Sequence, residues 1–383
     1  MAGLYIHIPF CTKRCVYCDF FSDTQIHYKE RFLSAIIEEM TQRRDYLGGE
    51  SVETIYLGGG TPSLLSAAEW EPVFEAIYRL FPVCEDAEIT MEANPDDLTP
   101  GYVASLARLP INRISLGVQS FNDTDLRFLR RRHTGQQAID ALRLCREQGY
   151  DNISIDLIYG LPGQTPARWQ ANLSEALHAD VAHISAYHLT YETDTPLYRL
   201  KAQGLIQPVD EEVSLSLYNT LIYMLTAAGY QHYEISNFAL PGRISRHNSS
   251  YWTFRPYLGI GPSAHSYNTL SRQWNISSLP HYIEGLRNAS LCPETEILTP
   301  HDKYNEYILT GLRTCWGIHL PQIQAKFGET KHSYCKTQAQ RYLSSGMLRE
   351  EGDRLILTQD GWFVSDSIIS TLLWMDSYTK EGF

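Results

Sequence analysis

Several features that would place a chain outside the ordinary globular class are missing from this sequence of 383 residues. No apolar run is long enough to cross a bilayer, and the N-terminus lacks a basic region followed by a signal-type apolar segment. Low-complexity segments are also absent. Because apolar residues make up 43 % and charged residues 20 % of the chain, disordered and fibrous classes are excluded. We therefore expect a globular protein in the cytoplasm.

Positive charge is scarce as well. There are 32 Lys and Arg residues against 44 Asp and Glu, which gives a net charge of -12. A broad electrostatic surface for nucleic acid would have to oppose this field, so nucleic acid is not an expected partner. One dense basic run stands out, and its ordinary interpretation is a solvated helix face; it contains Arg127, Arg130, Arg131, Arg132 and His133.

Cysteine is sparse, with 8 residues in the chain, but three of them are close together. Cys11, Cys15 and Cys18 follow the alternating apolar stretch LYIHI at spacings of four and three residues. A disulfide scaffold is excluded by the low count, and a zinc site would need a second cysteine pair that does not follow. Isolated Cys84 and Cys145 are better explained as small buried residues. Three adjacent thiolates suit a [4Fe-4S] cluster whose fourth iron is open to a small molecule.

One pattern of segments repeats through the first half of the chain. Short β-branched runs alternate with segments of helical pattern, which predicts βαβ units and a parallel sheet. The expected strands are 4–8, 53–57, 88–92, 113–118, 152–159 and 183–189. The expected helices between them are 28–46, 67–80, 99–108, 136–149 and 166–179. The fold class is therefore α/β, as a partial or full β/α barrel.

Polar residues follow many of these expected strands. In a β/α barrel the carboxyl ends of the strands form one mouth, where active sites are built. The residues that would meet there are Cys11, 58–61, Glu92, Asn94, Gln119 and Asp156. The sequence thus predicts a site at the barrel mouth that includes the cysteines.

Beyond about residue 285 the pattern changes. Helices are expected at 301–314, 319–327, 334–345 and 361–373, with a hairpin at 346–358. Several short helices with a two-stranded wing indicate a small winged-helix-like domain. We expect a barrel core over residues 1–285 and this C-terminal domain over 286–383.

At this point the motifs resemble a known superfamily. CTKRCVYC is similar to the cluster motif of radical S-adenosylmethionine proteins, in which the open iron chelates the amino and carboxylate groups of the cofactor. YLGGGTP resembles their glycine-rich cofactor loop, although a run of glycines alone is also an ordinary turn. LYIHIPFC, GGGTPS, ITMEANPDDLT, RISLGVQSFN, RRRH and SIDLIYGLPGQT together resemble the oxygen-independent coproporphyrinogen III oxidases and their relatives.

The resemblance implies roles for particular residues. Cys11, Cys15 and Cys18 would hold the cluster. The remaining residues would contact S-adenosylmethionine, which is the implied second cofactor: Tyr5 and Tyr17 near its ribose and adenine, Gly59, Gly60 and Thr61 at its methionine end, and Glu92, Gln119, Arg131 and Asp156 through polar contacts. The alternative for each acid is a strand-end cap, and for Arg131 a surface position.

One departure from the oxidases matters. Their motif continues to a further cysteine, whereas Asp19 and Phe20 follow Cys18 here, and only ten residues precede Cys11. Both features resemble the sister family of haem chaperones, as does the HNSSYW element at His247. That resemblance implies haem as a ligand and makes His247 a candidate axial ligand, with aromatic neighbours offering area to a porphyrin. His7, His188 and His265 are the competing candidates.

Two functions stay open at the level of sequence. The first is a haem chaperone that delivers haem to an acceptor protein and keeps a cluster and S-adenosylmethionine site without coproporphyrinogen oxidase activity. The second is the radical decarboxylation of porphyrinogen propionates, where the cofactor supplies the radical and the barrel positions it. An electron donor such as flavodoxin or ferredoxin, and peripheral membrane association, are further expectations. The acceptor, covalent or non-covalent haem attachment, cofactor cleavage and oligomeric state do not follow from the sequence.

Overall fold

The computed structural model describes residues 1–375, and the chain divides into two compact units. Unit 1 comprises residues 1–231, 236–250 and 254–296, and unit 2 comprises 232–235, 251–253 and the segment from 297 onward. The expected boundary at 285/286 falls inside helix α10 (Leu279–Arg287), which packs on α1 (Lys29–Gln42) and so belongs to unit 1.

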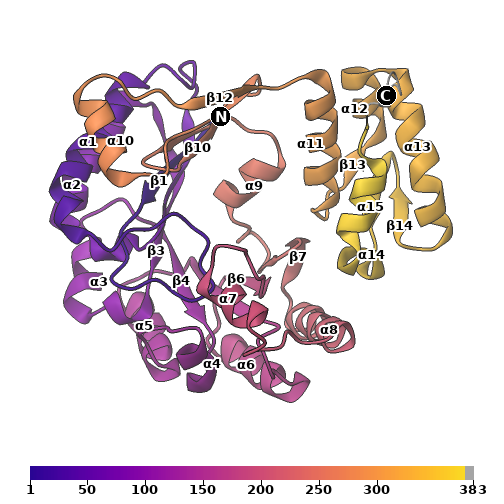
Figure 1. Ribbon diagram of the computed structural model, residues 1–383, viewed down its shortest axis with the longest axis horizontal. Helices are drawn as coiled ribbons and strands as arrows, with labels where there is room; N and C mark the ends of the chain where they lie inside the picture. The colour runs from indigo at the N-terminus through magenta and orange to yellow at the C-terminus, as the bar shows by residue number, and fades with distance from the viewer. Residues whose placement is uncertain (376–383) are drawn as a thin grey trace. The chain divides into compact units, whose positions relative to one another are not determined.

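The centre of unit 1 is a curved sheet whose first six strands are parallel (Figure 1). The strands are β1 (Ala2–Ile8), β2 (Val52–Gly59), β3 (Val83–Ala93), β4 (Arg113–Gln119), β5 (Ile153–Tyr159) and β6 (His183–His188). The order β12-β11-β10-β9-β1-β2-β3-β4-β5-β6-β8 is linear, where β12 is Glu294–Ile297. The short strand β7 (Gln231–Glu234) belongs mainly to unit 2. This sheet confirms the α/β class, and among the described residues the barrel is partial.

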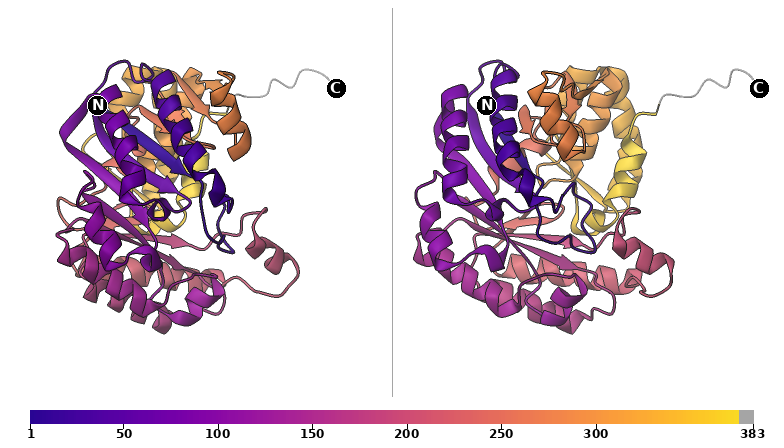
Figure 2. Two further views of the ribbon diagram at one scale, coloured as in Figure 1. Left: turned by 90° about the vertical axis from the view of Figure 1, so that its left-hand side faces the viewer. Right: turned by 60° about the vertical axis from the view of Figure 1, so that its left-hand side comes forward.

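Helices cover the outer face of this sheet, as Figures 1 and 2 show. The short helix α7 (Pro196–Ala202) stands apart from them, near the cysteine segment, where the Leu197 amide donates to Val16 O at 2.9 Å. The covering helices are α1, α2 (Ala67–Leu80), α3 (Pro100–Leu106), α4 (Asp123–Phe128), α5 (Gly135–Glu147), α6 (Pro166–His178) and α8 (Glu211–Ala227). Each buries an apolar stripe; in α2, for example, Trp70, Val73 and Ile77 are fully buried. A Ser66–Glu69 capping box begins that helix. The helix expected at 28–46 ends at Gln42, four residues early.

The two faces of the sheet differ in polarity because side chains alternate along each strand. Leu4, Ile6 and Ile8 of β1 are fully buried, in the apolar core. The alternate positions carry polar or small residues. Strand register pairs them as Gly3 with Thr54, Tyr5 with Tyr56, Thr90 with Arg113, Glu92 with Ser115 and Asp156 with Ser185. The inside of the partial barrel is therefore polar, although the strands read as apolar runs.

The remaining elements of unit 1 follow both ends of the parallel strands: β8 is antiparallel to β6, and β9, β10 and β11 extend the sheet beyond β1. They are β8 (Asn237–Ala239), β9 (Tyr257–Ile260), β10 (His265–Tyr267), β11 (Ser271–Trp274) and α10, together with the first part of α9 (Arg246–Trp252). β9 pairs in parallel with β1, and β10 and β11 continue antiparallel.

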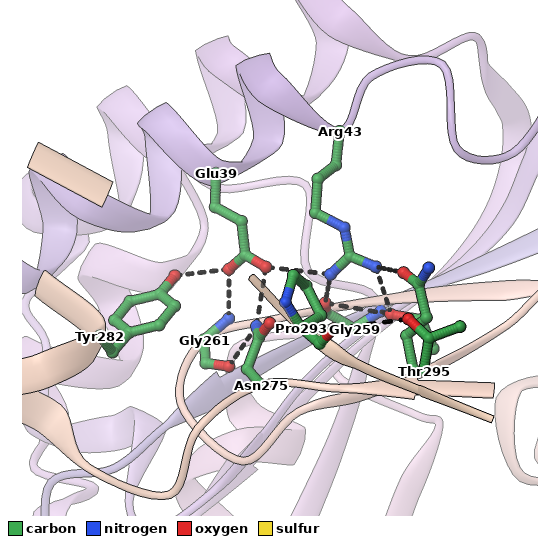
Figure 3. Close-up of polar contacts among 10 residues, drawn as sticks. Glu39, Arg43, Gly259, Gly261, Asn275, Tyr282, Pro293 and Thr295 are labelled. Atoms are coloured by element: carbon green, nitrogen blue, oxygen red, sulfur yellow. Dashed lines mark hydrogen bonds and ion pairs between the residues drawn. The ribbon is translucent and has the colours of Figure 1, made fainter. Parts of the chain in front are cut away.

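A buried polar network fixes α1 against this extension (Figure 3). The Glu39 carboxylate is fully buried and accepts hydrogen bonds from the Gly261 amide at 2.8 Å, Asn275 Nδ2 at 2.7 Å and the Tyr282 hydroxyl. Arg43 Nη1 lies 3.0 Å from Glu39 Oε1. Because a buried carboxylate is tolerated only when it is paired and hydrogen-bonded, these four donors account for its position.

Unit 2 is a small helical domain with a three-stranded sheet of order β13-β15-β14. Its elements are α11 (Pro300–Leu312), β13 (Ile318–His319), α12 (Leu320–Phe327), α13 (Glu329–Ser344), β14 (Leu348–Glu351), β15 (Arg354–Leu357), α14 (Gln359–Phe363) and α15 (Ser365–Leu372). The expected wing is the β14–β15 hairpin. Two features differ from expectation: the short β13 pairs with β15, and the last helix is interrupted at Val364. No helix within residues 1–375 is long and apolar enough to cross a membrane.

Candidate functional site

The three clustered cysteines lie on one loop at the carboxyl end of β1. The loop is closed at its base because the Cys11 amide donates to Asp23 O at 3.0 Å and the Asp23 amide to Pro9 O at 2.6 Å. Cys11, Cys15 and Cys18 are free thiols, and all three line one cavity of about 510 Å³ at the barrel mouth.

The glycine loop after β2 lies directly against the start of the cysteine loop. The Gly60 amide donates to Ile8 O at 2.7 Å, and a Cβ on Gly60 would lie 2.7 Å from Phe10 O and 3.1 Å from Cys11 Sγ. Gly59 has φ +107°, and a Cβ there would meet the His7 ring at 2.6 Å. Both positions thus require glycine.

Two carboxyl groups, Glu92 and Asp156, line the inner part of the cavity. Glu92 accepts from the Tyr56 hydroxyl at 2.8 Å and from the Gly59 amide at 3.0 Å. Burial and the nearby Asp156 raise the pKa of Glu92 to about 7, and burial raises the pKa of Asp156 to about 6. The cavity therefore holds two acids that favour a cationic ligand when ionised.

Arg131 joins the cysteine loop to the strand ends. Its Nη1 lies 3.4 Å from Cys15 Sγ, and its Nη2 donates to Gly117 O at 2.8 Å and to Asn94 Oδ1. Asn94 Nδ2 donates in turn to Thr61 Oγ1 at 3.2 Å, and Thr61 Oγ1 lies 3.5 Å from Cys11 Sγ. A chain of polar contacts therefore connects two of the cysteines.

The interpretation of the basic run as a solvated helix face is wrong for part of it. Helix α4 ends at Phe128, so residues 130–133 lie in a turn. Arg131 points to the cysteine loop, and His133 is buried with Nε2 at 3.0 Å from Val118 O. Arg132 pairs with Asp96 and Asp97, whereas Arg127 and Arg130 are exposed. Sequence spacing alone did not separate these residues.

Gln119 and Tyr17 complete the predicted lining. Gln119 ends β4 with φ +64°, beside a register shift between β4 and β5. A non-glycine residue in this conformation is strained, and such strain is frequent at functional sites. Tyr17 packs against an apolar cluster that includes Val16 and Leu129 while it lines the cavity.

The donor set fits a [4Fe-4S] cluster. Burial raises the pKa of the Cys11 thiol, and it raises that of Cys18 to about 11, so thiolates there require a cationic partner such as iron. Within residues 1–375, no three His, Cys, Asp or Glu side chains converge on a single-ion site. In a cluster each cysteine binds a different iron, so the three sulfurs need not surround one ion.

Tyr5 and His247 are the two predicted residues that lie outside the cavity lining. The His247 ring is 1 % exposed and lies inside the barrel, where its Nδ1 is 2.8 Å from Thr54 Oγ1 and its ring stacks on Tyr56 at 5.0 Å. Tyr5 hydrogen-bonds to His7 Nδ1 at 3.0 Å. In this conformation neither side chain reaches the mouth.

The other candidate histidines have different surroundings. Both ring nitrogens of His7 are engaged, by Tyr5 and by Phe21 O, and the residue is buried. His265 stacks on Trp274 outside the cavity. His188, by contrast, is exposed at the cavity mouth.

Sequence reasoning missed several residues that line the cavity. Tyr56 and Asn248 had no assigned role, and Asn94 was noted only as a strand-end residue. The alternation of side chains along β2 could have indicated Tyr56, because Thr54, Tyr56 and Gly58 are two residues apart and so lie on the same face of the strand. Nothing in the sequence indicates that Asn248 lines a cavity built from residues at least 56 positions earlier.

Comparison with known proteins agrees with this geometry. A family model of the Radical SAM superfamily matches residues 5–176, and one of the HemN C-terminal domain matches residues 298–364. The protein named "Heme chaperone HemW" from Escherichia coli (strain K12) is 38 % identical over 378 residues, covering 97 % of this chain and 98 % of that protein. Its namesake from Lactococcus lactis is 33 % identical over 372 residues, covering 97 % of each.

Among solved structures, coproporphyrinogen III oxidase (HemN) from Escherichia coli matches with a TM-score of 0.84. It covers 97 % of this chain and 90 % of that chain at 23 % identity, so the likeness shows the fold alone. The full-length similarity to its curated relatives is of another kind. It shows that the chain belongs to the HemW family, within the radical S-adenosylmethionine superfamily.

Proposed function

We propose that this protein is a haem chaperone, which binds haem and passes it to an acceptor protein. The observation that carries the proposal is similarity along nearly the whole chain to proteins named heme chaperones, 38 % identical over 97 % of it in one case. The cavity supports it, because its rim offers apolar and aromatic surface beside the cysteine loop: Phe20 is 67 % and Tyr187 is 44 % exposed.

In this proposal Cys11, Cys15 and Cys18 would hold the [4Fe-4S] cluster, and S-adenosylmethionine would bind beside it in the cavity. When bound, the cluster and cofactor supply one-electron chemistry. The protein's own contribution is positioning. Gly59 and Gly60 let the glycine loop pack closely on His7 and on the start of the cysteine loop, because a Cβ at either position would meet those residues. Glu92 and Asp156 line the cavity, where they would attract the cationic parts of the cofactor.

The other predicted contacts have supporting geometry of their own. Arg131 donates toward Cys15 and Asn94, so it orders the cluster loop and leaves a charge beside the cofactor carboxylate. Gln119, Thr61 and Tyr17 line the same cavity. Tyr5 would act from beneath, through the hydrogen bond to His7 that packs against Gly59.

In this conformation His188 is better placed than His247 to bind the haem iron. His188 Nδ1 lies 3.1 Å from Leu189 O, so Nδ1 carries the proton and Nε2 keeps the lone pair that binds iron. The present partner of Nε2 is the Ser214 hydroxyl at 2.8 Å, which a metal can displace. His247 as ligand stays a prediction that requires its segment to leave the barrel interior. Arg14, Arg130 and Arg132 also line the cavity and suit propionates.

The wider setting is part of the proposal. We place the protein in the cytoplasm, with an acceptor protein as haem partner. Reduction of the cluster would use a flavodoxin or ferredoxin, and haem transfer to a membrane-bound acceptor would involve peripheral membrane association.

Coproporphyrinogen oxidation is the alternative function. The fold is compatible with it, since the HemN structure covers 97 % of this chain with a TM-score of 0.84. Against it stands Phe20, at the position where the resemblance to the oxidases calls for a further cysteine.

Anaerobically reconstituted protein decides between the two functions. We expect haem binding by absorption spectroscopy, haem transfer to an apo-acceptor such as an apocytochrome, and no protoporphyrinogen from coproporphyrinogen III with a reductant and S-adenosylmethionine. Robust conversion would establish the oxidase instead. For the ligand, His188→Ala should shift the haem bands, while His178→Ala on α6, outside the cavity, should not. Unchanged bands in His188→Ala, with a shift in His247→Ala, would return the ligand to His247.

A further inference from the structure

Arg113 is a fully buried cation inside the barrel, 1 % exposed, with an unusual lack of partners. Its Nε and Nη2 atoms are inaccessible and have no hydrogen-bond partner among the described residues. Two buried guanidinium nitrogens without hydrogen bonds are costly, so the retention of Arg113 calls for a compensating interaction or a function.

The strand register places Arg113 one interior layer below Glu92 and two below Asp156. It pairs with Thr90 on β3, while Ser115, two residues on, pairs with Glu92. Ser115 also pairs with Ser154 on β5, two residues before Asp156. Alternation keeps all of these positions on the polar inner face of the sheet. The guanidinium thus lies beneath the acids, outside the cavity lining itself.

The groups facing Arg113 are two acids, one phenol and two histidines, from five different elements. They are Tyr56 on β2, Glu92 on β3, Asp156 on β5, His183 on β6 and His247 on α9. Burial, together with Arg113, lowers the pKa of His183 and brings that of His247 to about 3, so both imidazoles are neutral. Arg113 is therefore the positive charge that acts on Glu92. Asp156 is influenced by two positive charges, Arg113 from below and Arg131 from the mouth of the barrel.

We propose that Arg113 is a positioning residue whose fixed charge keeps Glu92 and Asp156 ionised, so that the floor of the cavity attracts a cationic ligand. The ligand class is an organic cation that also carries hydroxyls, as S-adenosylmethionine does. The inference rests on the proposed cofactor site. Coulomb attraction does not require direct contact, which explains why the guanidinium lacks hydrogen bonds to the acids it serves.

The alternative is a purely structural role. A structural arginine would exchange hydrogen bonds with its neighbours, yet two of its nitrogens have none. An apolar side chain of similar volume would then pack at least as well, as it does when buried ion pairs are replaced. The acids supply the reason for a charge, because burial opposes their ionisation.

The test is the pH profile of S-adenosylmethionine binding to cluster-loaded Arg113→Met, with Arg113→Lys as the charge-preserving control. Loss of an opposite charge raises the pKa of a neighbouring acid by about one unit or more. We expect the midpoint of the wild-type profile to move up by about one pH unit, with affinity about tenfold weaker below the wild-type midpoint and progressively less affected above it. Arg113→Lys should stay near wild type. An unchanged profile in Arg113→Met with full iron content, or equal pH-independent losses in both variants, would overturn the proposal.

A second measurement needs no cofactor and covers the case in which Arg113→Met folds poorly. If Arg113 acts through the acids, its removal should destabilise the wild-type background and be neutral or stabilising in Glu92→Gln/Asp156→Asn, where the buried guanidinium has no acid left to balance it. Chemical unfolding of the four proteins gives the coupling. Equal losses in both backgrounds refute the electrostatic role, whereas unaltered cofactor affinity in Glu92→Gln/Asp156→Asn alone would refute only the placement of the cofactor.

Discussion

Replacement of Gly60 by alanine is a sharp test of how the glycine loop and the cysteine loop fit together. A Cβ at this position would lie 2.7 Å from Phe10 O and 2.9 Å from Ile8 O, where ordinary contact begins at 3.4 Å. Both obstacles are backbone atoms, so the loops must separate by about half an ångström or more. The Gly60 amide bond to Ile8 O at 2.7 Å then weakens, and Cys11 Sγ, 3.1 Å from the new Cβ, is displaced.

The size of the effect follows from these two losses. Overpacking costs about 1–3 kcal/mol and the weakened hydrogen bond about 1 kcal/mol, so we expect Gly60→Ala to lose about 2–4 kcal/mol of unfolding free energy. Because a cluster tolerates little displacement of a ligand, iron and sulfide content after anaerobic reconstitution should fall well below the wild-type level.

A matched control exists on helix α3. A Cβ at Gly101 would meet no atom within 4 Å, so Gly101→Ala should be neutral or stabilising by up to about 1 kcal/mol with full iron content. Thermal unfolding and iron analysis of the two variants give the comparison. Gly60→Ala with wild-type iron content and stability would show that the close approach of the two loops is not needed to seat the cluster.

Three further outcomes follow from described contacts. Cys15→Ala should lose the cluster, and Cys84→Ala should keep it. A full iron content in Cys15→Ala would show that Cys15 is not a ligand of the cluster. Glu39→Gln should lose about 2–4 kcal/mol in urea unfolding because Arg43 loses its buried partner, against almost no loss for exposed Glu38→Gln, and equal losses would contradict this. Burial raises the pKa of Glu92 from 4.5 to about 7, so its contribution to stability is lost as pH rises through that range. The stability of cofactor-free Glu92→Gln relative to wild type should therefore rise by about 2.5 kcal/mol between pH 5 and pH 8, and a constant difference would argue against the raised pKa.

The sequence predicts the strands and the cluster residues well because both depend on local pattern. Alternating β-branched runs and turn residues recur at the right spacing, and a cysteine motif is read from consecutive positions. The sequence also predicted that YLGGGTP forms a glycine-rich loop after a strand. Its strict requirement for glycine at Gly60 depends on backbone atoms some 50 residues earlier, which only the fold brings near.

Other parts of the site depend on distant contacts that no local pattern records. HNSSYW indicated an accessible haem ligand, but the structure inserts His247 beside Thr54, 193 residues away. In the sequence Arg113 is only a polar residue at the start of an apolar strand. A role for its charge can be proposed only once the fold places it near Glu92 and Asp156. Likewise, whether Arg131 faces solvent or Cys15 was decided by the end of α4 at Phe128 rather than by the charge pattern.

The position of β1 between β2 and β9 has a consequence for the order of events during synthesis. Gly3 pairs with Thr54 on one side and with Tyr257 on the other, so the first strand completes its pairing only after more than 250 residues have been made. At about 5–20 residues per second this takes about 10–50 s.

During that interval the cysteine loop, which begins directly after β1, is anchored on one side only. Contacts of such long sequence separation also form late in folding. Assembly of the iron–sulfur group is therefore expected to follow translation, and a ribosome-bound nascent chain stalled before residue 257 should present three reactive thiols instead of a binding site.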